Sequence, residues 1–348
     1  MKVVRDDTRA AVILEWTFGK LPNQPYSGFV IIDGVRPVAA FMVNEWNGGS
    51  LHLTATAKAP LTIGAARQVA HAAQRGVALM PQVKNIIAVA SGKGGVGKST
   101  TAVNLALALA AEGATVGMLD ADIYGPSQPM MLGVSGKPDS KDGKTMEPLE
   151  AHGLQIASIG FMIDPDQPMV WRGPMVTQAL QQLLELTNWR DLDYLVVDMP
   201  PGTGDIQLTL SQKVPVTGAI IVTTPQDIAL LDARKGLKMF EKVGIPILGI
   251  VENMSTHICS NCGHEEHIFG AGGGEAMCKD YKVDLLGSLP LDIKIREQSD
   301  GGKPTVMSEP NSQIAQIYKE IARKTASKLS QLALDHSSKF PNIVIQNT

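Results

Sequence analysis

The chain has 348 residues, enough for about two domains, and its 31 Lys and Arg residues against 34 Asp and Glu residues leave a net charge of −3. This mildly acidic balance, without a long basic run, argues against a general nucleic-acid-binding protein. Three cysteines are too few for a secreted disulfide framework, and no apolar stretch reaches the ~20 residues of a membrane span. The charged N-terminus is also unlike a signal peptide, so we expect a cytoplasmic protein that does not bind membranes.

Residues 1–82 are predicted to form a small α+β domain. Alternating or continuous apolar patterns indicate strands at residues 29–35, 38–43 and 50–56. Residues 64–78 are Ala-rich, with apolar positions spaced for one face of a helix. No residues in this segment form a recognisable functional site.

Residues 83–335 are predicted to form an α/β domain, a P-loop NTPase with a mostly parallel sheet covered by helices on both faces, followed by a tail at 336–348. A helix at 99–111 follows the first strand, and a last helix is expected at 311–334. Continuous runs of Val, Ile and Leu between helices are typical of such a buried sheet. The predicted strands are residues 86–90, 115–119, 195–198, 219–223 and 247–251.

A phosphate-binding loop is predicted between the first strand and the helix after it. The pattern G-x-x-x-x-G-K-[ST] is matched at every position by Gly92-Lys93-Gly94-Gly95-Val96-Gly97-Lys98-Ser99, and Thr100 follows. The glycines allow backbone N–H groups to surround a phosphate at the positive end of the helix. We expect this loop to bind ATP, with Lys98 on the β- and γ-phosphates and Ser99 on Mg²⁺.

Carboxylates follow two of the predicted strands. Asp120 and Asp122 come after the strand at 115–119, and Asp198 ends the strand at 195–198. Ligands of open α/β sheets bind at this end of the strands. We expect Asp198 to hold Mg²⁺, directly or through water, and Asp122 to orient the attacking water, although an Asp after a strand often only caps a helix.

A Cys-x-x-Cys motif follows the strand at 247–251. Cys259 and Cys262 are spaced so that two thiolates can converge on one metal, and the loop setting argues against a thioredoxin-like redox pair. The motif is half of a four-cysteine site, and Zn²⁺ and a [4Fe–4S] cluster both suit it. Three completions are open besides a metal-free thiol pair: a zinc knuckle with one or two histidines, the addition of Cys278, or two chains that each give both cysteines to one site. The candidate third ligands are His257, His264, His267 and Cys278.

Lys93 adds a second lysine to the phosphate-binding loop. The run Lys93-Gly94-Gly95-Val96-Gly97-Lys98-Ser99-Thr100 resembles the deviant Walker A motif of the ParA/MinD superfamily. In that superfamily the first lysine crosses a dimer interface to the partner's nucleotide, as an arginine finger does in trans. The resemblance implies a nucleotide-dependent homodimer in which Lys93 acts in trans. With the roles expected above for Lys98 and Asp122, the predicted catalytic residues are Lys93, Lys98 and Asp122. The plain alternative is that Lys93 is a solvated surface lysine.

Longer motifs resemble the Mrp/ApbC family of iron–sulfur cluster carriers over about residues 84–300. Besides the phosphate-binding loop they are Asp120-Ala121-Asp122-Ile123-Tyr124-Gly125-Pro126-Ser127, Trp171-Arg172-Gly173-Pro174-Met175, Asp198-Met199-Pro200-Pro201-Gly202-Thr203-Gly204-Asp205, and Glu252-Asn253-Met254-Ser255 before the Cys259–Cys262 pair. The resemblance implies an ATP-hydrolysing homodimer that binds a labile [4Fe–4S] cluster from an upstream donor and passes it to apo-proteins. It also implies that Asn253 and Pro290 contact the adenine. Cys278 is additional to this pattern and is expected to pack in the core.

Two rival functions are considered. A ParA/MinD-like positioning switch with a structural zinc knuckle would need a basic surface for a membrane or nucleoid. The helix at 311–334 is the candidate for that surface, although its pattern is ordinary for a helix packed on a sheet. A nitrogenase-reductase-like electron donor ranks last, because by family resemblance its cluster cysteines lie elsewhere. The basic residues of the helix are Lys319, Arg323, Lys324 and Lys328.

Overall fold

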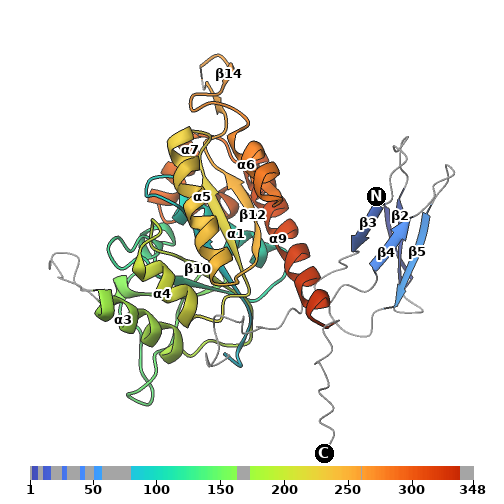
Figure 1. Ribbon diagram of the computed structural model, residues 1–348. Helices are drawn as coiled ribbons and strands as arrows, with labels where there is room; N and C mark the ends of the chain where they lie inside the picture. The colour runs from blue at the N-terminus through green and yellow to red at the C-terminus, as the bar shows by residue number, and fades with distance from the viewer. Residues whose placement is uncertain are drawn as a thin grey trace, which may run out of the picture.

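The computed structural model describes residues 80–162, 173–259 and 261–337, together with the backbone of five strands within the first 56 residues (Figure 1). β1, β2 and β5 form one antiparallel sheet, and β3 and β4 form an antiparallel pair. Their bounds are β1 Lys2–Asp6, β2 Ala11–Trp16, β3 Tyr26–Phe29, β4 Ala40–Val43 and β5 Leu51–Thr56.

The N-terminal predictions are met in part. The strands predicted at 38–43 and 50–56 overlap β4 and β5, whereas β1 and β2 are additional to the predicted strands. The strand predicted at 29–35 touches β3 only at Phe29. Residues 30–35 and the helix predicted at 64–78 lie outside the described residues.

An eight-stranded sheet forms the centre of the second region, in the order β15-β12-β11-β6-β10-β7-β9-β8. Every neighbouring pair is parallel except β8 with β9. All residues of β7, β10 and β11 are buried, as expected for a parallel sheet covered on both faces. The bounds are β6 Val83–Ala90, β7 Val116–Asp120, β8 Leu149–Ala151, β9 Leu154–Ser158, β10 Leu192–Asp198, β11 Gly218–Thr223, β12 Ile247–Glu252 and β15 Leu285–Ser288.

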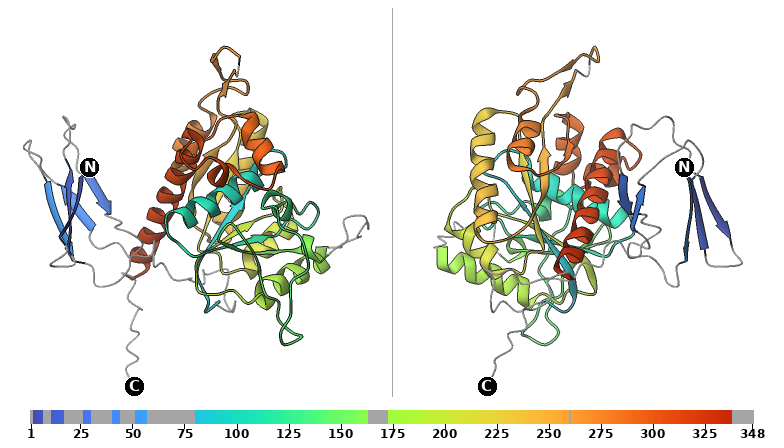
Figure 2. Two further views of the ribbon diagram at one scale, coloured as in Figure 1. Left: turned by 180° about the vertical axis from the view of Figure 1, so that it is seen from behind. Right: turned by 45° about the vertical axis from the view of Figure 1, so that its right-hand side comes forward.

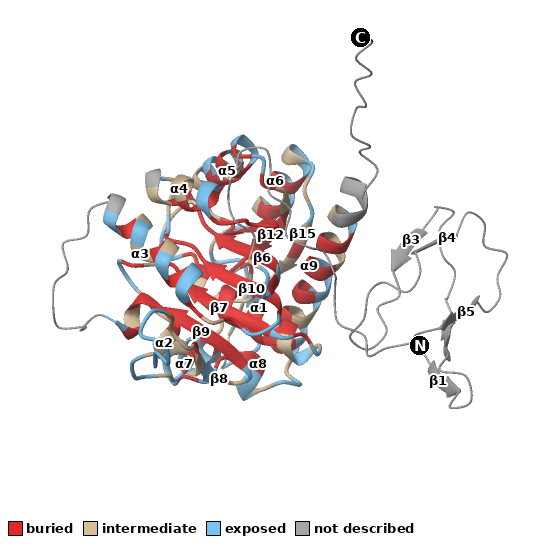
Figure 3. Ribbon diagram, turned by 90° about the horizontal axis from the view of Figure 1, so that it is seen from below, coloured by how far each residue is buried: buried red, intermediate tan, exposed pale blue. Residues whose placement is uncertain are grey.

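Helices cover the two faces of this sheet with separate hydrophobic cores (Figure 3). One core contains apolar side chains of α1, α8 and α9, and Figure 2 shows α1 beside α9. The other contains side chains of α3, α4, α5 and α6. The bounds are α1 Lys98–Ala111, α2 Gln128–Met131, α3 Gly173–Leu186, α4 Asp205–Lys213, α5 Asp227–Lys242, α6 Gly273–Tyr281, α7 Ile293–Asp300, α8 Thr305–Ser308 and α9 Gln313–Ser337.

The predicted mostly parallel sheet with helices on both faces is confirmed. The described α/β region begins with β6 at Val83, one residue after the predicted domain boundary. α9 ends at Ser337 and so extends slightly into the predicted tail. The five predicted strands correspond to β6, β7, β10, β11 and β12, and they are the five central strands of the sheet.

Candidate functional site

The phosphate-binding loop connects β6 to α1. Gly95 and Gly97 both have φ of 80°, in the left-handed region where glycine is unstrained. Gly92 is required for a different reason: a Cβ there would lie 2.0 Å from the Asp232 carbonyl carbon of α5. The glycines therefore shape the loop and allow α5 to approach its backbone.

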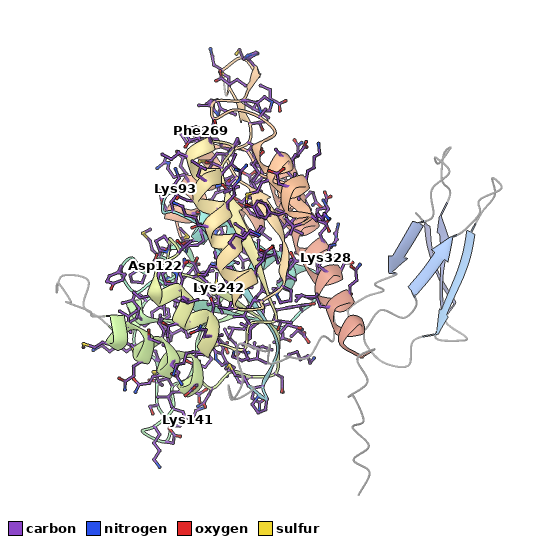
Figure 4. All side chains as sticks on the ribbon, in the orientation of Figure 1. Lys93, Asp122, Lys141, Lys242, Phe269 and Lys328 are labelled. Carbon is purple, nitrogen blue, oxygen red and sulfur yellow. The ribbon has the colours of Figure 1, made fainter. Side chains whose placement is uncertain are left out.

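The two lysines of the loop have different surroundings. Lys98 is buried, and its Nζ donates to Oδ1 of Asp198 and, at 3.1 Å, to Oγ of Ser99. Lys93 is partly exposed, and its side chain has no hydrogen bond or ion pair within the described part of the chain (Figure 4). The contacts of Lys98 bring it together with Ser99 and Asp198, which are the residues predicted to bind the phosphates and Mg²⁺. The roles of these three residues and of Lys93 stay predictions.

Asp120 organises the segment that follows β7. Its Oδ1 accepts a hydrogen bond from the Asp122 amide at 3.2 Å, and its Oδ2 accepts from the Gln128 amide and from Ser158 Oγ, both at 3.1 Å. Burial, together with the nearby Asp198 charge, raises the pKa of Asp120 to about 7. Asp120 thus fixes the backbone that carries Asp122.

Asp122 has an unused acceptor. Its Oδ1 is buried and accepts no hydrogen bond from the described residues. Burial raises the pKa of this carboxyl, Lys98 lowers it, and Asp198 raises it again. A carboxyl group with a raised pKa and a free oxygen has the properties needed to hold a water. That Asp122 orients the attacking water stays a prediction.

The donor set at this end of the sheet fits Mg²⁺. The Ser99 hydroxyl and the carboxylates of Asp122 and Asp198 are hard oxygen donors, which Mg²⁺ prefers. Burial of oxygens without a partner, such as Asp122 Oδ1, is costly unless a ligand or water completes the site.

Gln128 is a site residue that no sequence pattern predicted. Its side-chain Nε2 donates to the Asp198 carboxylate at 2.9 Å and to the Ser99 carbonyl at 3.1 Å. Glutamine has no fixed place in the phosphate-binding or carboxylate patterns, so a single sequence carries no signal for this contact.

Asn253 lies directly after β12 and contacts the phosphate-binding loop. Its Nδ2 donates to the Val96 carbonyl at 2.9 Å and lies 2.1 Å from where a Cβ on Gly97 would be. Pro290 follows β15 nearby, since the Ser255 amide donates to the Leu289 carbonyl at 2.9 Å. The structure gives Asn253 a contact with the loop backbone, and the adenine contacts of Asn253 and Pro290 stay predictions.

The cysteine pair lies on a hairpin that projects beyond the sheet, near the β14 label of Figure 1. Its strands are β13 His257–Ile258 and β14 Glu265–Glu266. The Cys259 amide donates to the His264 carbonyl at 2.9 Å, and Cys259 is partly exposed while Cys262 is exposed. Hydrogen bonds from the Cys262 and Asn261 amides lower the pKa of Cys259, which favours its thiolate.

Within the part of the chain that the structure describes, no further ligand completes this site. The described residues contain no group of three or more His, Cys, Asp or Glu side chains that could hold a metal ion. Cys278 lies in α6, buried in the core beside Met277, and burial is the main cause that raises its pKa to about 11. The expectation that Cys278 packs in the core is therefore confirmed, and its use as a third ligand is not supported.

Comparison with known proteins identifies the family. The family model described as ParA: NUBPL iron-transfer P-loop NTPase matches residues 82–326. The chain belongs to the NUBPL iron-transfer P-loop NTPase family. Membership confirms the predicted resemblance, the P-loop NTPase fold and the ATPase class.

Relatives in this family carry iron–sulfur names. The chain is 65 % identical over 254 residues to the iron–sulfur cluster carrier protein of Pseudomonas fragi, covering 72 % of this chain and 88 % of the relative. It is 53 % identical over 249 residues to the mouse iron–sulfur cluster transfer protein NUBPL, covering 71 % and 78 %. A Dictyostelium discoideum protein of the same name is 43 % identical over 328 residues, covering 93 % and 96 %.

Solved structures agree on the fold of this NTPase. A nucleotide-binding protein from Archaeoglobus fulgidus, solved with ADP, is 36 % identical with a TM-score of 0.59, covering 68 % of this chain and 92 % of that one. The cell division ATPase MinD of Pyrococcus furiosus has a TM-score of 0.53 at 24 % identity, covering 69 % and 97 %, and shows the fold alone.

The basic residues that a positioning switch would need are already paired in this NTPase. Lys319 Nζ donates to the Pro310 carbonyl at 2.9 Å, and the other three basic side chains of α9 meet carboxylates. Among the described helices, none is long and apolar enough to cross a bilayer. With the family identified, the positioning switch is not favoured. The three ion pairs are Arg323–Glu112, Lys324–Glu320 and Lys328–Asp284.

Proposed function

We propose that this chain is an ATP-hydrolysing carrier whose cargo is a labile [4Fe–4S] cluster, received from an upstream donor and passed to apo-proteins. The observation that carries the proposal is the Cys259–Cys262 pair, partly exposed at Cys259 and exposed at Cys262, on a hairpin beyond the nucleotide end of the sheet. The names of the relatives support iron–sulfur transfer as the task of the family. The activity is assigned to residues 83–335, with 1–82 as a separate domain and 336–348 as a tail.

A homodimer would complete the cluster site. A [4Fe–4S] cluster takes four cysteine ligands, and one chain offers one close pair. Twofold symmetry brings the same hairpin of two chains together and supplies four thiolates. Neither cysteine is buried, so the pair is accessible to a second copy, to a cluster donor or to an acceptor.

ATP and Mg²⁺ are proposed to bind where β6, β7 and β10 end. Mg²⁺ held there would neutralise the charge that develops on the phosphates during hydrolysis. In that complex the Lys98 ammonium would leave Asp198 and bind the phosphates. The Asp198 carboxylate and the Ser99 hydroxyl would then be available to hold the metal. Asp122 offers its free Oδ1 to the attacking water, and Lys93 is free to reach the nucleotide of the partner chain.

Anaerobic reconstitution with iron and sulfide tests the cargo site. The parent should hold about two iron atoms per chain, which is one cluster per dimer. Cys259→Ser and Cys262→Ser should each lose the cluster and still bind ATP, because the phosphate-binding loop is a separate site. Cys278→Ser is the matched control: it removes a buried thiol and should retain the cluster. A full iron load in Cys259→Ser would contradict the proposal.

The same preparation separates the zinc alternative. A zinc knuckle predicts one metal per monomer, no acid-labile sulfide, and loss of the metal when His257, His264 or His267 is replaced. The cluster carrier predicts sulfide equal to iron and no dependence on these histidines. Analysis of iron, zinc and sulfide per chain, together with the mass of the reconstituted species, decides between them.

A further inference from the structure

One buried glutamine joins three parts of the nucleotide site. The backbone amide of Gln128 donates to Oδ2 of Asp120 at 3.1 Å. Its side-chain Nε2 donates to Oδ2 of Asp198 at 2.9 Å and to the Ser99 carbonyl at 3.1 Å. The side chain has 0 % exposure, although α2, on which it lies, is only four residues long.

The orientation of the Gln128 carboxamide follows from its neighbours. Both groups that face its nitrogen, a carboxylate and a carbonyl, can only accept hydrogen bonds. A flipped amide would place its oxygen against these two oxygens and lose both bonds. The oxygen Oε1 therefore points elsewhere, where it is buried and accepts no hydrogen bond from the described residues.

Asp198 has two partners on its two oxygens, and they differ in what nucleotide binding does to them. Lys98 holds Oδ1, and it must leave if it is to reach a phosphate. Gln128 holds Oδ2 and has no reason to move, because its other bonds go to the Ser99 carbonyl and, through its own backbone, to Asp120. Gln128 thus remains to orient Asp198 once the lysine has gone.

We propose that Gln128 is a positioning residue for ATP hydrolysis: it fixes the Asp198 carboxylate relative to Ser99, and its Oε1 is left as an acceptor for a donor that arrives with the nucleotide. The inference rests on the proposed role of Asp198. A hydrogen bond to a charged group is worth enough to change a rate by about 10- to 100-fold when it is lost. A residue that only fills space would be replaced by Leu or Met without such a loss.

The test compares Gln128→Leu with Gln155→Leu in the full-length chain. Gln155 is the matched control: it is also nearly buried, with Nε2 on the Arg190 carbonyl at 3.0 Å and Oε1 on the Arg190 amide at 2.8 Å, and it lies on β9 outside the nucleotide site. We expect Gln128→Leu to lower kcat about 10- to 100-fold at saturating ATP and Mg²⁺. Gln155→Leu should lower thermal stability about as much as Gln128→Leu does, but it should retain the parental kcat. Gln128→Met provides the same test if the Leu variant does not fold.

A second readout does not depend on turnover. Calorimetric titration with ATP, with and without Mg²⁺, should show that Gln128→Leu loses most of the affinity that Mg²⁺ adds in the parent. In an Asp198→Asn background the same substitution should weaken ATP binding in the presence of Mg²⁺ by less than about 2-fold, because Gln128 acts through that carboxylate. Parental kcat and parental Mg²⁺ dependence in both Gln128 variants would overturn the positioning role. Parental hydrolysis by Asp198→Asn would instead overturn the proposed site itself.

Discussion

Removal of the Lys98 side chain should destabilise the nucleotide-free protein, in addition to weakening ATP binding. The Lys98 and Asp198 side chains are 6 % and 0 % exposed and form an ion pair. In Lys98→Ala, the Asp198 carboxylate stays buried near Asp120, with the Gln128 amide as its remaining donor among the described residues. Loss of one partner of such a buried pair costs about 3–5 kcal/mol. Since 1 kcal/mol corresponds to about 2–4 °C in a domain of this size, we expect Tm to fall by about 10 °C.

Thermal unfolding without nucleotide, followed by circular dichroism, measures this effect. Lys235→Ala is the control, because Lys235 pairs with Asp232 at 2.9 Å but the two side chains are 67 % and 29 % exposed, and it should cost about 1 kcal/mol or less. The double variant Lys98→Ala/Asp198→Asn removes the stranded charge and should recover at least about half of the lost stability. Parental stability of Lys98→Ala, or a double variant less stable than Lys98→Ala, would refute the reasoning.

Three further predictions concern the same end of the sheet. Because the folded pKa of Asp120 is raised from 3.8 to about 7, ionisation of Asp120 should remove up to roughly 4 kcal/mol of the parent's stability as pH rises through that range. Urea titrations across this pH range should show that Asp120→Asn lacks this loss. Gly92→Ala should destabilise the chain by about 3 kcal/mol or more, because its Cβ would lie 2.0 Å from the backbone of α5. Gly94→Ala is the control, since a Cβ on Gly94 would be 3.9 Å from its nearest neighbour, and thermal unfolding compares the two variants. Lys93→Ala should bind ATP normally but hydrolyse it slowly, and mixing it with Lys98→Ala chains should restore activity if Lys93 acts in trans. No rescue after verified subunit exchange would contradict that role.

Local patterns predicted the parts of the site that lie at the ends of strands. The phosphate-binding loop follows β6, and Asp120 and Asp198 are the last residues of β7 and β10. The Val, Ile and Leu content of these strands identifies them in the sequence, so the positions of the site residues in the chain also fix their places at the edge of the sheet. The cysteine spacing likewise indicated a loop, and the structure places both cysteines on a hairpin.

Contacts between distant segments could not be predicted in this way. Gln128 reaches Asp198 across 70 residues, and Asn253 reaches Val96 across 157. Gly92 matches a general pattern, but its close approach to α5 depends on the packing of a helix far along the chain. Short or edge strands such as β8, with three residues, also carry too little pattern to be recognised from the sequence.

The position of β6 in the middle of the sheet has a consequence for synthesis of the chain. Its neighbours are β10 and β11, and contacts of Lys84 with Asp193 and of Ile86 with Thr217 span 109 and 131 residues. At about 5–20 residues per second, a ribosome needs roughly 10 s to make the strands that enclose β6 after β6 itself has emerged. During that interval an apolar strand lacks its partners and is exposed to aggregation or to chaperones. A nascent chain that stops before β11 therefore carries the sequence of the phosphate-binding loop without the sheet that shapes it.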